Sequence, residues 1–274
     1  LKAIRDELSH ENLIYVADSA NAPYGDQDPT FIADRTNLIS RFLIASHAKA
    51  IVVACNTATV VAIDQLRAWC PIPVIAMEPA IKPAAIRTQS GVVGVLATGH
   101  TVASSSVARL CSQYGTDAKI LLKPCPGLVE FVERGELSSS DTRSLLSGYL
   151  TPLLEAGVDV LVIGCTHYSF LTALIRELAG PNVEVIDPAA SVARELTRRL
   201  GTNRRSAARL EPPSERFFTS GQTSVGQSVM STLLGKGIFV HSLENPDANG
   251  AASSNPSIER TCPGKPGHAS HLKR

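Results

Sequence analysis

The sequence has no long apolar segment, no block of like charges and no closely spaced cysteines. A transmembrane helix needs about 20 consecutive apolar residues, whereas the longest apolar runs, such as residues 50–55, have the length of a β-strand. The 26 lysine and arginine residues balance 25 aspartate and glutamate residues, without five or six like charges in a row. These absences argue against a membrane-spanning protein and against a dedicated nucleic-acid or membrane-surface binder.

The cysteines also lack the spacing of a metal site or a disulfide framework. No two of the six form a C-x-x-C pair, so we expect reduced cysteines, a cytoplasmic location and no bound metal. Charged residues interrupt the first eight positions, where a signal peptide would have a continuous apolar core. The six are Cys55, Cys70, Cys111, Cys125, Cys165 and Cys262.

Short runs rich in β-branched residues alternate with longer segments of helical period. Strands are expected at residues 12–17, 50–54, 73–76, 92–97, 119–122, 159–163, 182–186 and 216–218. Helices are expected at residues 29–47, 59–69, 102–114, 140–156, 169–179 and 189–200. Consecutive apolar residues are typical of parallel strands buried on both faces, so the alternation predicts an α/β protein with parallel sheets. Residues 243–274 are rich in Asn, Pro, Ser and Gly, and we expect this tail to be disordered.

Two of the expected strands end in the same way. Residues 50–57 read AIVVACNT and residues 159–167 read DVLVIGCTH, so each strand ends in a small residue, a cysteine and polar residues. This internal similarity suggests two α/β lobes related by an approximate two-fold axis. Ligands bind at the carboxyl ends of parallel strands, where a helix N-terminus is expected to lower the pKa of a cysteine.

Two thiols that face each other across a cleft suit the inversion of a stereocentre. One group removes a proton from one face of the carbon while the other delivers a proton to the opposite face. A nucleophilic cysteine hydrolase, which needs one cysteine and a histidine, is the alternative at this point. Cys70, Cys111 and Cys125 are expected to be packing residues.

Three segments resemble the bacterial glutamate racemases, which are cofactor-independent members of the aspartate/glutamate racemase superfamily. They are Ala22-Pro-Tyr-Gly25, Ala54-Cys-Asn-Thr-Ala58 and Gly164-Cys-Thr-His-Tyr168, and the resemblance extends over residues 1–242. His167 favours glutamate racemase over aspartate racemase, which tends to have an acidic residue there. Aspartate racemase or a broad amino-acid racemase is the nearest alternative.

The resemblance implies a role for each matching residue. Cys55 and Cys165 would be the catalytic acid/base pair, with Cys55 facing the α-proton of D-glutamate and Cys165 that of L-glutamate. His167 would assist Cys165, and Glu133 would lie on the same side. The substrate-binding residues would be Tyr24, Gly25, Asn56, Thr57, Thr98, Thr101, Thr166 and His167. No cofactor and no metal are implied, and the product D-glutamate would supply peptidoglycan synthesis.

The resemblance also implies an architecture and partners. The site would lie between a first lobe of residues 1–82 and 193–242 and a second lobe of residues 83–192. A homodimer is expected. Some glutamate racemases also inhibit DNA gyrase, so a protein-binding role is a further alternative, whereas the net charge of +1 argues against direct DNA binding.

The amino-terminal end departs from the family pattern. The family begins with a strand that ends in Asp-Ser-Gly-x-Gly-Gly, whereas residues 1–8 match the helix that follows that motif. Asp18-Ser19 belongs to the family's second strand. From this comparison we expect an amino-terminally truncated racemase, or a gene model with a wrong start.

Overall fold

The computed structural model describes residues 1–201 and 212–243. Apart from Leu243, the tail for which the sequence predicts disorder therefore lies outside the described residues. Within those two ranges, no helix combines the length and the apolar character that crossing a membrane requires.

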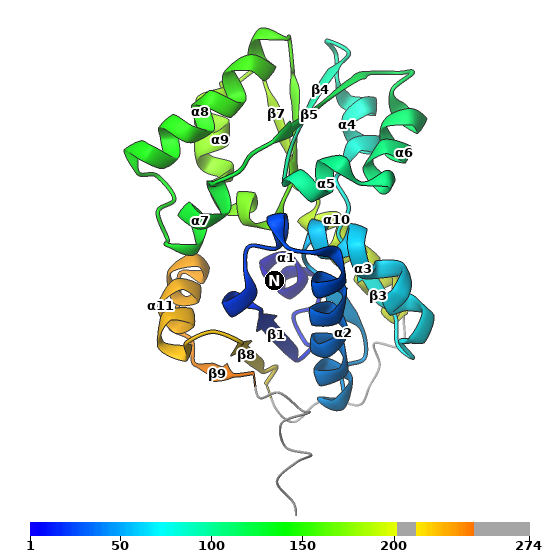
Figure 1. The fold of residues 1–274 in the computed structure, drawn as a ribbon, viewed down its shortest axis with the longest axis vertical. Coiled ribbons are helices and arrows are strands. Elements are labelled where there is room, and N and C mark those ends of the chain that lie inside the picture. The colour runs from blue at the N-terminus through cyan, green and yellow to red at the C-terminus, as the bar shows by residue number, and fades with distance from the viewer. Residues whose placement is uncertain (202–211, 244–274) are drawn as a thin grey trace, which may run out of the picture. The chain divides into compact units, whose positions relative to one another are not determined.

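Within the described residues, all strands pair in parallel, in three sheets (Figure 1). The strands are β1 (Leu13–Ala17), β2 (Ile51–Val53), β3 (Val74–Ala76), β4 (Val92–Ala97), β5 (Lys119–Pro124), β6 (Val160–Gly164), β7 (Glu184–Ile186), β8 (Glu215–Thr219) and β9 (Val240–Ser242). β8 lies between β1 and β9, β2 pairs with β3, and the third sheet has the order β5-β4-β6-β7. The parallel pairing confirms the predicted α/β class.

Helices connect the strands. They are α1 (Lys2–Glu7), η1 (Ser19–Asn21), η2 (Tyr24–Asp26), α2 (Pro29–Ala45), α3 (Asn56–Trp69), α4 (Ile81–Arg87), α5 (Gly99–Ala103), α6 (Ser105–Tyr114), α7 (Leu128–Glu133), α8 (Ser140–Glu155), η3 (Thr166–Leu171), α9 (Thr172–Ala179), α10 (Ala189–Leu200) and α11 (Thr223–Leu234). Side-chain caps begin several of them: Asp28 accepts hydrogen bonds from the first turn of α2, and Ser104 and Ser139 cap α6 and α8. Gly235, with φ 65°, ends α11.

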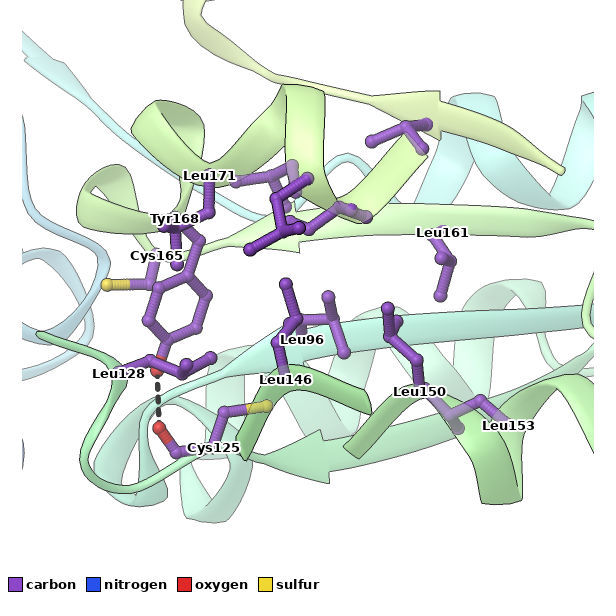
Figure 2. Packing of buried hydrophobic residues seen from close by; sticks show 14 of the residues in the cluster. Leu96, Cys125, Leu128, Leu146, Leu150, Leu153, Leu161, Cys165, Tyr168 and Leu171 are labelled. Carbon is purple, nitrogen blue, oxygen red and sulfur yellow. Dashed lines mark hydrogen bonds between the residues drawn. The ribbon is translucent and has the colours of Figure 1, made fainter. Parts of the chain in front are cut away.

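The largest core packs against the four-stranded sheet and supports the segment that carries Cys165. Helices α8 and α9 cover one face of this sheet, and α4 and α6 cover the other (Figure 1). Leu146 and Leu150 of α8 belong to the same buried cluster as Tyr168, whose hydroxyl group donates a hydrogen bond to the carbonyl oxygen of Cys125 at 2.9 Å (Figure 2). The sulfur of Cys165 points away from the leucine side chains, so the core fixes the backbone of this segment and leaves the thiol free for the site.

The expected elements agree with the observed ones in most places. Residues 102–114 form two helices, α5 and α6, because Ser104 between them has an extended backbone. Residues 169–179 begin within η3 and continue into α9. The sequence did not predict β9, α4, α7 or α11.

The strands of the four-stranded sheet all fall within residues 83–192, and those of the two smaller sheets fall outside that range. The division into lobes at residues 82 and 193, and the approximate two-fold axis, stay predictions.

Candidate active site

Cys55 and Cys165 each lie between the end of a parallel strand and the start of a helix. Ala54 and Cys55 connect β2 to α3, and Cys165 connects β6 to η3. The two cysteines have similar extended backbones, with φ −153° and −142°. Both thiols are therefore at the edge of a parallel sheet where α/β proteins bind ligands.

One cavity of about 450 Å³ has both cysteines in its lining. The other predicted site residues in the lining are Tyr24, Gly25, Asn56, Thr57, Thr98, Glu133, Thr166 and His167. Thr101 is not part of the lining: it is fully buried behind Thr98, whose hydroxyl group donates to Thr101 Oγ1 at 3.0 Å. Among the described residues, no lysine or arginine lines the cavity.

Two hydrogen bonds connect the segments that carry the cysteines. Asn56 Nδ2 donates to the carbonyl oxygen of Gly164, and Thr166 Oγ1 donates to that of Ala54 at 3.1 Å. The backbone at Gly164 also lies close to the neighbouring strand β4, because a Cβ atom on Gly164 would lie 2.8 Å from the carbonyl oxygen of Leu96. The amide oxygen of Asn56 is buried and has no hydrogen-bond partner among the described residues.

Burial controls the protonation of Cys55. It raises the pKa of this thiol to about 11, and the neighbouring Cys165 acts in the same direction. The backbone N–H of Ala58, 3.4 Å from Cys55 Sγ, offsets only part of this effect. The sequence-based expectation that the helix N-terminus lowers the pKa is therefore wrong for Cys55, which is a protonated thiol at neutral pH.

Cys165 has a different environment, because an imidazole and a carboxylate lie beside it. His167 Nε2 is 2.7 Å from Glu133 Oε1, at the end of α7. Burial alone would lower the pKa of His167, but hydrogen bonds with Cys165 and Glu133 raise it to about 10. At neutral pH, His167 is therefore a cation between the sulfur and the carboxylate.

Threonine hydroxyl groups form another part of the wall. Thr57 Oγ1 and Thr98 Oγ1 are hydrogen-bonded at 2.8 Å, and the hydroxyl group of Thr98 donates a further hydrogen bond to Thr101. The backbone of Gly25 lies against Thr98, because a Cβ atom on Gly25 would be 3.6 Å from Thr98 Cβ. The Tyr24–Gly25 segment therefore adjoins the polar wall that continues to the residues after Cys55.

Sequence reasoning did not include Asp18 among the site residues, although it lines the cavity. Its carboxylate accepts hydrogen bonds from the hydroxyl group of Tyr24 and from Arg35. A signal for it was present: Asp18 directly follows a predicted strand, as Cys55 does, and Cys165 follows its strand after one residue. Within the described residues, no group of three or more His, Cys, Asp and Glu side chains is placed to hold a metal ion.

Comparisons with known proteins agree on one family. Residues 1–196 match the family model described as Asp/Glu/hydantoin racemase. The glutamate racemase of Stutzerimonas stutzeri (strain A1501) is 44% identical over 241 residues, which cover 88% of this chain and 90% of the relative. The glutamate racemase of Ectopseudomonas mendocina (strain ymp) is 46% identical over 242 residues, which cover 88% and 92%.

Solved structures give the same result. Glutamate racemase isoform RacE1 from Bacillus anthracis superposes with a TM-score of 0.79 at 30% identity, covering 89% of this chain and 92% of that chain. Escherichia coli glutamate racemase, solved with L-glutamate and the activator UDP-MurNAc-Ala, superposes with a TM-score of 0.76 at 28% identity, covering 88% and 91%.

The family model covers both strand-end cysteines, and the close relatives match 88% of the chain. This extent confirms the resemblance that three short motifs had suggested. With its two thiols in one cavity between parallel-sheet elements, the chain belongs to the Asp/Glu/hydantoin racemase family.

Proposed function

We propose that the chain interconverts L-glutamate and D-glutamate without a cofactor, with Cys55 and Cys165 as the two acid/base groups. One observation carries the proposal: two strand-end thiols line a single cavity, and two hydrogen bonds connect their segments. The matching relatives are named glutamate racemases. The D-glutamate formed supplies peptidoglycan synthesis in the cytoplasm.

The reaction transfers two protons on opposite faces of the α-carbon. From L-glutamate, the thiolate of Cys165 takes the α-proton, which breaks the C–H bond and leaves a carbanion. The thiol of Cys55 then gives its proton to the opposite face, which forms the new C–H bond and D-glutamate. Cys165 is now the thiol and Cys55 the thiolate, so the reverse reaction from D-glutamate follows the same two steps in the opposite order.

The unequal surroundings of the two sulfurs fit these roles. Burial keeps Cys55 protonated at neutral pH, as the proton donor in the L-to-D direction requires. The cationic His167, held by Glu133, places a positive charge beside the sulfur that removes the proton from L-glutamate. Each transfer by a positioned acid or base contributes roughly 10²- to 10⁴-fold to the rate.

Neutral polar groups contribute to holding the substrate. The buried amide oxygen of Asn56 has no partner, so it is available to accept a hydrogen bond from the substrate ammonium group. The hydroxyl groups of Thr57 and Thr98 both line the cavity, and on binding they turn from each other to donate to a substrate carboxylate.

The proposal is tested with purified protein by following the optical rotation of L-glutamate and of D-glutamate, with L-aspartate in parallel. We expect both glutamate enantiomers to racemise and aspartate to react far more slowly. Cys55→Ala and Cys165→Ala should each reduce racemisation by at least roughly 10²-fold, because each removes the thiol that carries the proton on one face. Cys111→Ala, which alters a cysteine on α6 outside the cavity, is the matched control.

Deuterium exchange separates the two faces. In deuterated water, Cys55→Ala should still exchange the α-proton of L-glutamate with retention, because Cys165 remains. A Cys55→Ala protein that racemises at the rate of the parent would overturn the two-thiol mechanism. Racemisation of aspartate but not glutamate would overturn the substrate assignment.

The sequence also led to two expectations about protein partners. The homodimer stays a prediction, which sedimentation velocity tests directly. The comparisons give no support to the gyrase-binding alternative, and we do not propose it.

A further inference from the structure

We propose that Asp18 is a positioning residue that holds the Tyr24–Gly25 wall of the cavity in place by acting through the hydroxyl group of Tyr24. The inference rests on the proposed function, because that wall is part of the glutamate site. Asp18 follows the last residue of β1, and its side chain is only 8% exposed. Asp18 is neither one of the two thiol residues nor one of the groups beside Cys165, which are His167 and Glu133.

The Asp18 carboxylate has partners on both oxygens. Oδ1 accepts from Arg35 Nη2 at 2.7 Å and from Asn21 Nδ2 at 3.0 Å. Oδ2 accepts from Arg35 Nε at 2.9 Å and from the hydroxyl group of Tyr24. A two-point contact with the planar guanidinium group fixes both the position and the rotation of the carboxylate. Arg35 lies on α2, so this ion pair attaches the end of β1 to a long helix.

The direction of the Tyr24 hydrogen bond follows from the charge of Asp18. Burial alone would raise the pKa of this carboxyl group, but the hydrogen bonds from Arg35 and Tyr24 lower it to about 2. An ionised carboxylate only accepts hydrogen bonds, so the Tyr24 hydroxyl group must donate. This fixed donor role determines the orientation of the phenol ring in the cavity lining.

The position of Tyr24 is transmitted to the substrate site by contact. Gly25 is the next residue, and its backbone packs against Thr98. Thr98 in turn is hydrogen-bonded to Thr57, two residues after Cys55. Loss of the Asp18 hydrogen bonds should therefore displace the Tyr24–Gly25 wall of the cavity. The proton-transfer groups Cys55 and Cys165 keep their own contacts. The expected effect falls on substrate binding rather than on the chemical step.

The first test measures kcat and KM for both glutamate enantiomers in Asp18→Asn. Asparagine keeps the size of the side chain but loses the charge, so we expect KM to rise about tenfold while kcat changes less than about threefold. The matched control is Glu215→Gln, which removes the charge of another partly buried carboxylate. Glu215 pairs with Arg5 at 2.9 Å at the beginning of β8 and does not line the cavity. The control should leave both constants unchanged.

A double-mutant cycle tests the route through the hydroxyl group. Tyr24→Phe removes only that group and should raise KM by a similar factor. If Asp18 acts through it, the Asp18→Asn/Tyr24→Phe double variant has the same KM as Tyr24→Phe alone. KM increases that multiply in the double variant would overturn the proposed route. Tyr24→Phe also keeps the proposal testable if Asp18→Asn fails to fold, since an unchanged KM in Tyr24→Phe would equally overturn it.

Hydrogen exchange provides a readout that needs no activity. Asp18→Asn should speed amide exchange in residues 19–27, and Glu215→Gln should not. A parent protein that does not racemise glutamate contradicts the proposed function, and the exchange measurement still decides the role of Asp18. A parent that racemises, combined with unchanged KM and unchanged exchange in Asp18→Asn, contradicts the role of Asp18 alone.

Discussion

Asn56 and Thr166 make equivalent hydrogen bonds in opposite directions. Each residue follows one cysteine, and its side chain donates to the carbonyl group of the residue that precedes the other cysteine. The acceptors are Gly164 and Ala54. Because each bond runs from one cysteine segment to the other, the pair fixes the spacing of the two strand ends. Proton transfer on both faces of one carbon depends on that spacing.

Removing one of these bonds should affect catalysis more than stability. Thr166→Val keeps the shape of the side chain but cannot donate to Ala54, so the free energy of unfolding should fall by only about 1 kcal/mol. We expect kcat to fall by about tenfold or more, because the reacting groups lose their alignment. Urea unfolding and initial rates measure the two effects. Thr232→Val is the control, since its hydroxyl group donates to Ser228 within α11. An equal loss of kcat in both variants would contradict the linking role.

The pKa of Cys55 predicts how its reaction with iodoacetamide depends on pH. Because burial raises this pKa to about 11, little thiolate exists at neutral pH. The alkylation rate of Cys55 should therefore keep rising as the pH increases to about 11. Peptide mapping by mass spectrometry distinguishes Cys55 from the other cysteines. A rate that reaches its plateau below about pH 8 would show that the thiol ionises more readily than its burial implies.

His167 should contribute stability in the lower part of the pH range. Its folded-state pKa of about 10 lies above the ordinary value of 6.5, so the contribution is complete below pH 6.5 and is lost as the pH rises through 10. Glu133→Gln removes one cause of the raised pKa. The stability difference between the parent and this variant should be largest near about pH 6 and should narrow toward about pH 10. NMR titration of labelled histidine should show a lower pKa for His167 in the variant. A gap that widens with pH would contradict this assignment.

The contribution of Asp18 to stability depends on pH in the opposite direction to that of His167. Its folded-state pKa of about 2 lies below the ordinary value of 3.8, so its contribution is present above pH 3.8 and is lost as the pH falls through 2. The pH-dependent part amounts to about 2 kcal/mol. Chemical unfolding of the parent and of Asp18→Asn should give a difference that is constant from about pH 5 to pH 7 and shrinks below about pH 4. A difference that does not change with pH would mean that the charge of Asp18 is not what stabilises the fold.

The sequence was most informative where local chemistry dictates structure. The continuous apolar run at residues 92–97 became β4 with the same bounds, because its residues are buried on both sides in the centre of a sheet. The strand-end position of the two cysteines was also predictable. The family resemblance then named the neighbouring polar residues, and nearly all of them line the same cavity.

The sequence was least informative where tertiary contacts decide. β9 has only three residues, and it is a strand because β8 pairs with it. α3 begins at Asn56 rather than Thr59, since the sulfur of Cys55 accepts the hydrogen bond from Ala58 that a Ser or Asp cap would normally accept. The direction of the Cys55 pKa depends on its depth of burial, which the sequence does not reveal. The importance of Asp18 depends on Arg35, 17 residues away.

The absence of lysine and arginine from the cavity lining, within the described part of the chain, affects how tightly a dicarboxylate is held. His167 is a cation in this lining, but it is already paired with Glu133, so the substrate carboxylates meet no lysine or arginine there and added salt should alter binding only weakly. A racemase has an equilibrium constant of one, and each enantiomer is both substrate and product. Modest affinity for both allows either one to leave, so a lining without lysine or arginine favours rapid exchange of ligand over tight capture.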